Sequence, residues 1–293
     1  MKILLTGSHG QVGFELNKKL SALGEVIATD REELNLEDAQ AIRSFIDATK
    51  PDIIINPAAY TAVDKAESEP EVAHLINVSA PEVLAEKVRE LDIPLIHFST
   101  DYVFDGQKKA AYVETDETNP QSVYGKTKCE GEEKVRTHAK HIILRTSWVF
   151  GGHGNNFLKT MLRLIQEKES LNIVADQWGA PASATMLSDV TFKIVDAIFK
   201  NKNFNDYGTY HVTSNGETNW FEYANLIASE LIKLNVNIKC VPDQIRPIVT
   251  SEYPTAAKRP LNSRLNTDKI KKTFMLELPH WESEVKKVLR EVI

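Results

Sequence analysis

Tyr124 and Lys128 are the pair of residues whose types and spacing point most directly to chemistry. They are four positions apart, so a helix would carry both side chains on one face. A lysine charge near a phenol favours the ionised phenol and lowers its pKa from a reference value of about 10. Thr100 ends an apolar run and offers a hydroxyl that can hold a carbonyl oxygen against that phenol. Together these groups predict proton donation to a ketone during its reduction. The same spacing also occurs by chance on helix surfaces, so the surrounding elements decide between the two interpretations.

A glycine-rich turn near the N-terminus predicts a binding site for a phosphate group. An apolar run at residues 3–6 is followed by Gly7, Gly10 and Gly13, and a helical pattern begins within this turn. Glycines let backbone N–H groups approach a pyrophosphate, and the N-terminus of a helix favours its negative charge. The spacing is G-x-x-G-x-x-G, which differs from the G-x-G-x-x-G of simple dinucleotide dehydrogenases. Glycine turns also join strands to helices for steric reasons alone, but the position directly after the first apolar run favours the phosphate site.

Asp30 ends the second apolar run and lies roughly 20 residues beyond the glycines. A carboxylate at this position accepts hydrogen bonds from an adenosine ribose and repels a 2′-phosphate, which favours NADH. Arg31 follows directly and could clamp such a phosphate, so NADPH also stays possible. An aspartate with no role beyond the turn is the alternative.

Apolar runs at residues 3–6, 25–30, 51–56, 95–100 and 141–146 alternate with helical patterns. This alternation predicts an α/β fold with a Rossmann-like, doubly wound parallel sheet, in which ligands bind outside the carboxyl ends of the strands. The residues that fall at these ends are Gly7, Asp30, Ala58, Thr100 and Trp148. That coincidence favours a functional role for Tyr124 and Lys128 over a chance pair.

The alternation weakens beyond residue 150. We expect residues 1–150 to form a dinucleotide-binding domain, to which residues 183–215, approximately, add a helix around 187–199 and a strand around 208–212. Residues 151–182 and 216–293 should form a smaller, mixed α/β substrate-binding lobe.

The composition excludes several classes of protein. The net charge of −6 gives no broad basic field for nucleic acid, and no apolar run is long enough to span a membrane. The two cysteines, Cys129 and Cys240, are too few for a disulfide framework and fit a reducing cytoplasm. Three histidines, His9, His153 and His211, lack the spacing of metal ligands, and we interpret them as solvent or loop residues. We therefore predict a cytoplasmic enzyme without a metal site.

Longer blocks of the sequence are similar to a known family. The chain resembles the extended short-chain dehydrogenase/reductases, and among them the dTDP-4-dehydrorhamnose reductases, nearly from end to end. The blocks that carry the resemblance are residues 7–13, 56–67, 99–104, 124–128, 145–150, 154–157, 176–181 and 259–265. They are far more specific than the glycine turn or the tyrosine–lysine pair.

The resemblance implies a reaction and a set of site residues. Hydride would pass from NADH or NADPH to the C4 ketone of dTDP-4-dehydro-L-rhamnose and give dTDP-L-rhamnose. Tyr124 would donate the proton, Lys128 would hold the nicotinamide ribose, and Thr100 would hydrogen-bond the carbonyl oxygen. The residues expected to contact the cofactor are Gly7, Gly10, Gln11, Val12, Asp30, Asn35, Leu36, Ala58, Ala59, Tyr60, Thr61, Tyr124 and Lys128. The residues expected to contact the dTDP-sugar are Thr100, Asp101, Trp148, Asn156 and Arg259, with Arg259 on the diphosphate.

The resemblance leaves the assembly and two other functions open. Some members of the family dimerise through a magnesium ion held by glutamates; Glu15 matches one of them, whereas Thr185 stands where a second would be. We therefore expect a monomer or a weak homodimer that does not use magnesium. The alternatives for function are a nucleotide-sugar 4-epimerase, which shares the fold and the Tyr/Lys pair, and a non-catalytic regulatory subunit of a methionine adenosyltransferase.

Overall fold

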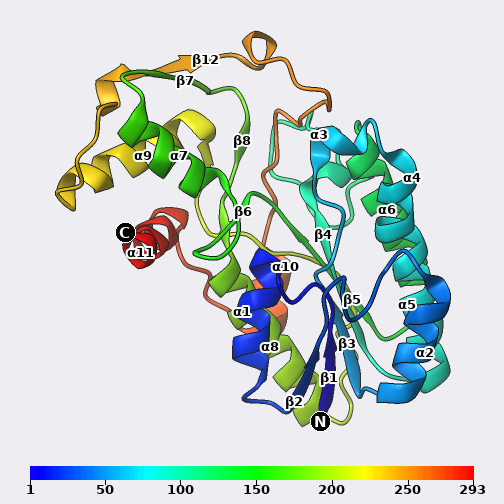
Figure 1. The fold of residues 1–293 in the computed structure, drawn as a ribbon. Coiled ribbons are helices and arrows are strands. Elements are labelled where there is room, and N and C mark those ends of the chain that lie inside the picture. The colour runs from blue at the N-terminus through cyan, green and yellow to red at the C-terminus, as the bar shows by residue number, and fades with distance from the viewer.

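The computed structural model describes residues 1–293 and contains a six-stranded parallel sheet between two layers of helices (Figure 1). The strand order is β10–β5–β4–β3–β1–β2. The strands are β1 (Lys2–Leu5), β2 (Glu25–Ala28), β3 (Ile53–Asn56), β4 (Leu95–Thr100), β5 (His141–Thr146) and β10 (Gly208–His211). The chain changes direction across the sheet between β1 and β3, where doubly wound sheets open a crevice for ligands. The predicted fold class is therefore confirmed.

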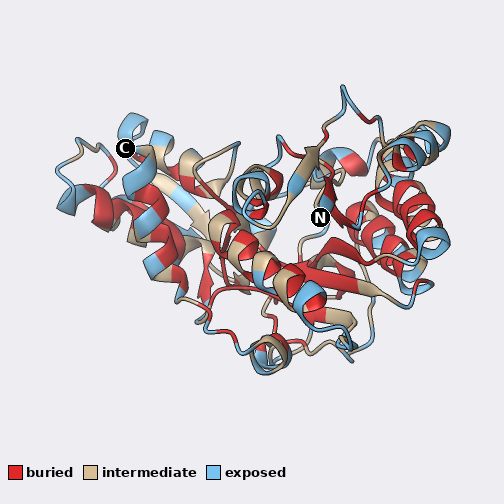
Figure 2. Cartoon of the chain, turned by 90° about the horizontal axis from the view of Figure 1, so that it is seen from below, coloured by how far each residue is buried: buried red, intermediate tan, exposed pale blue.

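Alternating side chains of the central strands fill two separate cores. Ile3 and Leu5 pack on one face with α1 (Gln11–Leu20), α8 (Ala184–Lys200) and α10 (Asp268–Phe274). Leu4, between them, packs on the other face with α2 (Ala39–Thr49), α5 (Ala80–Leu91) and α6 (Val123–Arg136). Figure 2 shows the strands and the inward faces of these helices as buried. Because both faces are covered, the strands read as continuous apolar runs.

A second lobe is built around its own core. The helices α7 (Phe157–Glu167), α9 (Trp220–Lys233) and α11 (Trp281–Val292) share one apolar cluster. Three short strand pairs complete the lobe and its junction with the sheet: β6 (Val149–Phe150) with β9 (Ala182–Ser183), β8 (Trp178–Gly179) with β11 (Thr218–Asn219), and β7 (Leu171–Val174) with β12 (Ile245–Ile248). None of the helices is long and apolar enough to cross a membrane.

The C-terminal part of the chain is shared between the two cores. Ile270 of α10, with Leu276 and Leu278 after it, packs into the cluster beneath the sheet. The apolar side of α10, which falls in the range 216–293 expected for the lobe, faces α8 and β10. The helix expected around 187–199 and the strand expected around 208–212 are α8 and β10, which pack with the sheet. The division into two domains stays a prediction.

One helical segment contains a π-turn that positions α6. The helices α3 (Val63–Ala66) and α4 (Pro70–His74) lead into the π-turn η1 (Leu75–Ser79), which continues into α5. Asn77 of this turn accepts a hydrogen bond from the Tyr60 amide at 2.8 Å and donates one to Thr127 Oγ1 at 3.1 Å. A Cβ atom at Gly131 would lie 2.0 Å from the Asn77 carbonyl oxygen, so only glycine permits this approach. The turn thereby fixes α6, which carries Tyr124 and Lys128.

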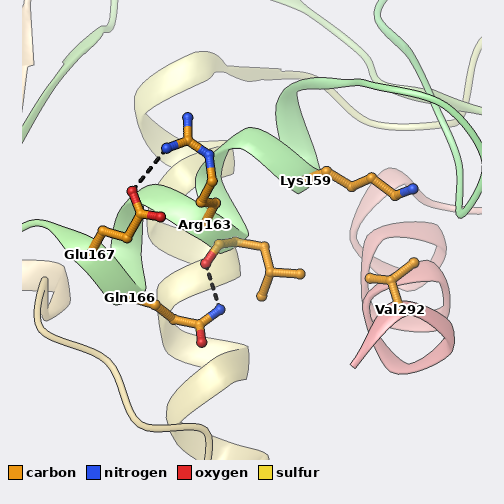
Figure 3. Close-up of a pocket in the computed structure, with 6 residues that line it drawn as sticks. Lys159, Arg163, Gln166, Glu167 and Val292 are labelled. Atoms are coloured by element: carbon orange, nitrogen blue, oxygen red, sulfur yellow. Dashed lines mark hydrogen bonds and ion pairs between the residues drawn. The ribbon is translucent and has the colours of Figure 1, made fainter.

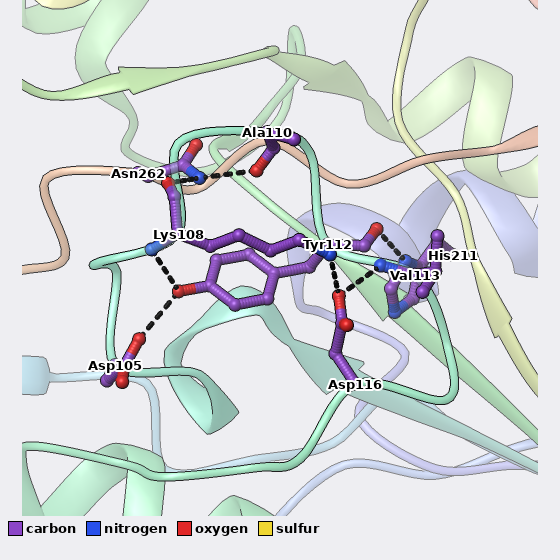
Figure 4. A network of polar contacts seen from close by, with 8 residues as sticks. All are labelled: Asp105, Lys108, Ala110, Tyr112, Val113, Asp116, His211 and Asn262. Carbon is purple, nitrogen blue, oxygen red and sulfur yellow. Dashed lines mark hydrogen bonds and ion pairs between the residues drawn. The ribbon is translucent and has the colours of Figure 1, made fainter.

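A polar network joins the loop after β4 to the segment at residues 259–265 (Figure 4). The 3₁₀ turn η2 (Asp101–Val103) opens that loop, while η3 (Pro242–Gln244) and η4 (Thr250–Glu252) lie in the lobe. Asn262 Nδ2 donates to the carbonyl oxygens of Lys108 and Ala110 at 2.6 and 2.9 Å. The Tyr112 amide donates to the Arg264 carbonyl oxygen at 2.8 Å. These bonds hold the segment that carries Arg259 against the sheet domain.

The prediction that His211 is a solvent or loop residue is wrong. His211 is fully buried in β10, where its Nδ1 lies 3.1 Å from the Tyr112 carbonyl oxygen and its ring packs edge-on against Phe104. Burial lowers the pKa of His211 to about 3, helped by the charge of Arg145, so the ring is neutral. The expectation failed because spacing in sequence does not reveal which face of a strand is covered.

Candidate active site

A cleft of about 690 Å³ opens at the carboxyl ends of the strands, between the sheet and the second lobe. The predicted residues that line it are Gly7, Gly10, Gln11, Val12, Asp30, Ala58, Ala59, Thr61, Thr100, Asp101, Tyr124, Lys128, Trp148 and Arg259. Asn35 and Leu36 instead line a smaller hollow of about 170 Å³, which shares Gly7, Asp30, Ala58 and Ala59 with the cleft. The two cavities therefore adjoin and form one elongated site.

A hollow of about 470 Å³ between α7 and the C-terminal end of α11 is a different surface feature (Figure 3). Arg163 and Glu167, which line it, pair with each other at 2.8 Å. None of its lining residues belongs to the cleft, and it plays no part in the site.

The glycine turn has the geometry of a phosphate cradle. Gly7 has a φ of +58°, and a Cβ atom there would lie 2.9 Å from the Cβ of Ala58. A Cβ atom at Gly13 would lie 2.0 Å from the Gly7 carbonyl oxygen. Gly10 is the N-cap of α1, and no side chain caps this helix. The first N–H groups of α1 are therefore available to an anion.

Asp30 and Arg31, which are predicted to meet an adenosine ribose and its 2′-phosphate, follow β2, and both have side-chain partners. Asp30 Oδ2 lies 2.8 Å from His9 Nδ1, and the exposed Arg31 pairs with Glu37 at 2.8 Å. Asp30 lines both cavities, whereas Arg31 lines only the smaller one. An extra phosphate on the ribose would have to draw Arg31 away from Glu37.

Two predicted contact residues lie outside both cavities. The Tyr60 hydroxyl donates to Glu69 at 2.6 Å, so Tyr60 holds the loop after β3 in place. Asn156 is the N-cap of α7, where it accepts a hydrogen bond from the Lys159 amide at 3.0 Å and donates to Gln11 Oε1 at 2.9 Å. The capping geometry turns the side chain toward the helix, so Asn156 does not line the cleft, and its substrate contact stays a prediction.

Thr100 and Asp101 form the floor of the cleft at the end of β4. Thr100 Oγ1 donates to Asp101 Oδ1 at 3.0 Å, while Asp101 Oδ2 is buried without a hydrogen-bond partner. Burial raises the pKa of Asp101 to about 6, and the nearby hydroxyls of Ser263 and Thr100 oppose this rise. An unpaired buried carboxylate oxygen is costly, so it favours a ligand hydroxyl at this position.

Tyr124 is held as a neutral phenol, contrary to the expectation that Lys128 lowers its pKa. Burial raises the pKa of Tyr124 above its usual value, and the Asp101 carboxylate adds to this while Thr100 opposes it. Lys128 Nζ donates to the Phe98 carbonyl oxygen at 2.7 Å. Burial also lowers the pKa of Lys128 to about 8, against the Glu132 charge, so the lysine is a weaker cation than expected. A protonated phenol is the form that can donate a proton.

The lobe contributes an aromatic platform that the sequence did not reveal in full. Trp148 has a φ of +49°, rare for a tryptophan, and stacks on Trp220 with ring centroids 3.8 Å apart. A Cβ atom at Gly179 would lie 2.9 Å from the Trp148 ring, so glycine at this position leaves room for the ring. Both tryptophans line the cleft. Strained backbone of this kind concentrates at functional sites.

Arg259 lines the cleft and lies in the segment that Asn262 ties to the loop after β4. Its Nη2 pairs with Asp64 Oδ2 at 2.8 Å, and the Ala257 amide donates to Asp64 Oδ1 at 3.1 Å. The Nε of Arg259 is buried without a partner. A buried, unpaired guanidinium N–H beside a cleft suits a phosphate oxygen.

Comparisons with known proteins agree with this arrangement. A family model described as RmlD substrate binding domain matches residues 1–293. The dTDP-4-dehydrorhamnose reductase of Escherichia coli (strain K12) is 43% identical over 297 residues, which cover 100% of this chain and 98% of that protein. The crystal structure of a dTDP-4-dehydrorhamnose reductase from Clostridium acetobutylicum matches with a TM-score of 0.92 at 38% identity, covering 100% of this chain and 99% of that chain. That of the Bacillus anthracis enzyme in complex with NADP matches with a TM-score of 0.90 at 33% identity, covering 99% of each chain. The chain therefore belongs to the dTDP-4-dehydrorhamnose reductase family.

Proposed function

We propose that this protein reduces the C4 ketone of dTDP-4-dehydro-L-rhamnose with NADH or NADPH and gives dTDP-L-rhamnose. One observation carries the proposal: Thr100, Tyr124 and Lys128 line a single cleft with the glycine turn, in a chain that matches reductases over its full length. The NADP in the Bacillus anthracis relative supports a nicotinamide cofactor here. Both cysteines are free and buried, which supports our further proposal that the protein acts in the cytoplasm.

The residues of the cleft have distinct tasks in this reaction. A bound nicotinamide cofactor would supply the hydride, held by the glycine turn and Asp30. Tyr124 gives its phenolic proton to the oxygen of the forming alkoxide, which is a stronger base than a phenolate. Thr100 has one hydroxyl proton, and in this structure Asp101 accepts it. That proton must turn away from Asp101 before Thr100 can donate to the carbonyl oxygen.

The proposal is tested by NADH and NADPH consumption with the ketone made from dTDP-glucose by the dehydratase and the epimerase. We expect cofactor oxidation only when both preceding enzymes have acted. A 4-epimerase would instead be purified with NAD bound, because it must keep the cofactor through each cycle. If the protein neither oxidised a cofactor nor contained bound NAD, the result would point to the non-catalytic alternative.

Arg259→Ala should raise the KM for the dTDP-sugar about 10–100-fold and leave the affinity for NADH unchanged. The estimate corresponds to the loss of a charge-assisted hydrogen bond, about 1.5–3 kcal/mol. Lys258→Ala is the control, because the exposed Lys258 bonds only Gln121, at 3.3 Å. Steady-state kinetics with each substrate varied separates the two effects. A raised KM for NADH with an unchanged sugar KM would move Arg259 to the cofactor.

Asp30→Ala should increase the use of NADPH relative to NADH. The substitution removes the carboxylate that repels a 2′-phosphate, and Arg31 stays beside the smaller cavity to meet it. The measurement is kcat/KM for both cofactors in the variant and in the unmodified protein. An unchanged ratio would mean that Asp30 does not reach the ribose.

We also propose a monomer, or a weak homodimer formed without magnesium. Glu15 pairs with Lys18 at 3.2 Å, and with Thr185 it lines a hollow that also contains Lys19 and Lys287. A divalent cation needs several oxygen ligands, and lysine charges oppose it. Sedimentation with and without a chelator should give the same mass. A dimer that dissociates when magnesium is removed would refute this proposal.

A further inference from the structure

Four buried side chains form a continuous hydrogen-bonded chain beneath the cleft. Thr6 Oγ1 donates to Asn56 Oδ1 at 2.6 Å, and Asn56 Nδ2 lies 3.0 Å from His97 Nδ1. His97 Nε2 in turn lies 3.3 Å from Lys128 Nζ. All four residues are at most 1% exposed. The chain runs from the residue before the glycine turn to the lysine of the cleft.

The sheet brings these residues together in one row. Leu4, Ile54 and Leu95 fill the core that faces α5 and α6. Thr6, directly after β1, Asn56 in β3 and His97 in β4 each lie two positions further along the chain, so their side chains point to the same face. Asn56 and His97 are direct partners in the parallel register of β3 and β4. Three polar side chains thus take the place of an apolar row, which is costly unless each is hydrogen-bonded.

The hydrogen bonds from Thr6 to Lys128 have a defined donor-to-acceptor direction. The Thr6 hydroxyl donates to the oxygen of the Asn56 amide, so the amide nitrogen is turned toward His97. That nitrogen can only donate, and His97 Nδ1 must therefore accept. Burial, with the Lys128 charge, holds the pKa of His97 well below its usual value, so the ring is neutral. A neutral ring that accepts at Nδ1 carries its proton on Nε2.

The Nε2–H of His97 faces Lys128 Nζ, and this contact distinguishes the two forms of the lysine. An ammonium has only donors and cannot accept this N–H, whereas an amine has a lone pair that can. The amine still has N–H groups for the Phe98 carbonyl oxygen, 2.7 Å away. We propose that Thr6, Asn56 and His97 are positioning residues that fix the Nε2–H tautomer and thereby favour the uncharged form of Lys128.

The consequence for catalysis rests on the proposed function. After Tyr124 has given its proton to the alkoxide, the phenolate needs a new one. Lys128 lies on the same face of α6 as Tyr124, and its ammonium form, but not its amine form, stabilises the phenolate electrostatically. The other charged or titratable groups around this part of the site are Glu132 of α6, Arg145 of β5 and Asp101 of η2. Of these, Glu132 raises the pKa of Lys128 and so opposes the amine form. The hydrogen-bonded residues Thr6, Asn56 and His97 favour the amine form.

The first test is the imidazole tautomer of His97, measured by ¹⁵N NMR on the full-length protein without substrate or cofactor. We expect the Nε2–H tautomer between pH 6 and pH 9. Thr6→Val should release the Asn56 amide and produce a population of the Nδ1–H tautomer. Thr191→Val is the matched control, since this buried threonine bonds only the Leu187 carbonyl oxygen, at 2.8 Å. An Nδ1–H tautomer in the unmodified protein, or no change in Thr6→Val, would overturn the proposal.

The second test is the alkaline limb of the pH–rate profile in His97→Gln. A glutamine amide can turn its oxygen toward Lys128 and accept from the ammonium, so the pKa of Lys128 should rise from about 8. A raised pKa keeps the lysine protonated to higher pH, and the limb should move upward by about one pH unit. His211→Gln, in the other fully buried strand histidine, should leave the limb in place. An unmoved limb in His97→Gln would contradict the proposal. The absence of any turnover with the dTDP-sugar would contradict only the proposed function, because the NMR test does not depend on turnover.

Discussion

Tyr124→Phe should lower kcat about 10²–10⁴-fold, the usual contribution of a positioned proton donor. The substitution removes one hydroxyl and keeps the buried ring, which packs edge-on against Tyr102 at 5.4 Å. Cofactor affinity should therefore change little. Single-turnover kinetics and NADPH binding measured by fluorescence separate the two quantities.

Tyr223→Phe is the matched control for this prediction. Tyr223 is also buried, and its hydroxyl has no hydrogen-bond partner in the core of the second lobe. Its removal should leave kcat unchanged. If Tyr124→Phe kept near-normal turnover, Tyr124 would not be the proton donor.

Arg145→Met should destabilise the protein by about 3–5 kcal/mol, the usual cost of leaving a buried charge without its partner. Arg145 Nε and Nη2 bond both carboxylate oxygens of Glu132, at 2.8 and 2.6 Å, and both residues are at most 1% exposed. Arg136 bonds one of the same oxygens at 2.5 Å and can offset only part of the loss. The free energy of unfolding in urea measures the effect.

The control is Arg163→Met, which breaks an exposed pair with Glu167 and should change stability only slightly. Equal effects of the two substitutions would mean that the buried pair contributes no more than a surface pair. Arg145→Met should also disturb the site, because Glu132 lies one helical turn beyond Lys128 and acts on its pKa.

The sheet and the glycine turn could be predicted because their signals are local. Apolar runs of strand length alternate with helical patterns, and the steric demand on Gly13 comes from Gly7 within the same turn. The helical spacing of Tyr124 and Lys128 likewise fixed their common face.

Other features depend on contacts between distant segments. Glu132 continues the four-residue spacing of Tyr124 and Lys128, so the signal was present, but only the fold supplies its partner Arg145. His97 looked like one more residue of an apolar strand, and the register with Asn56 gives it a role. Trp220 comes from the second lobe and meets Trp148 only in three dimensions.

The central claim, that this chain reduces the C4 ketone, is tested most directly by isotope transfer. NADPH carrying deuterium at the transferable position of its nicotinamide is incubated with the protein and dTDP-4-dehydro-L-rhamnose. The account predicts one deuterium at C4 of the sugar in dTDP-L-rhamnose, detected by NMR and mass spectrometry. A product without deuterium, or with the label at another carbon, would contradict it.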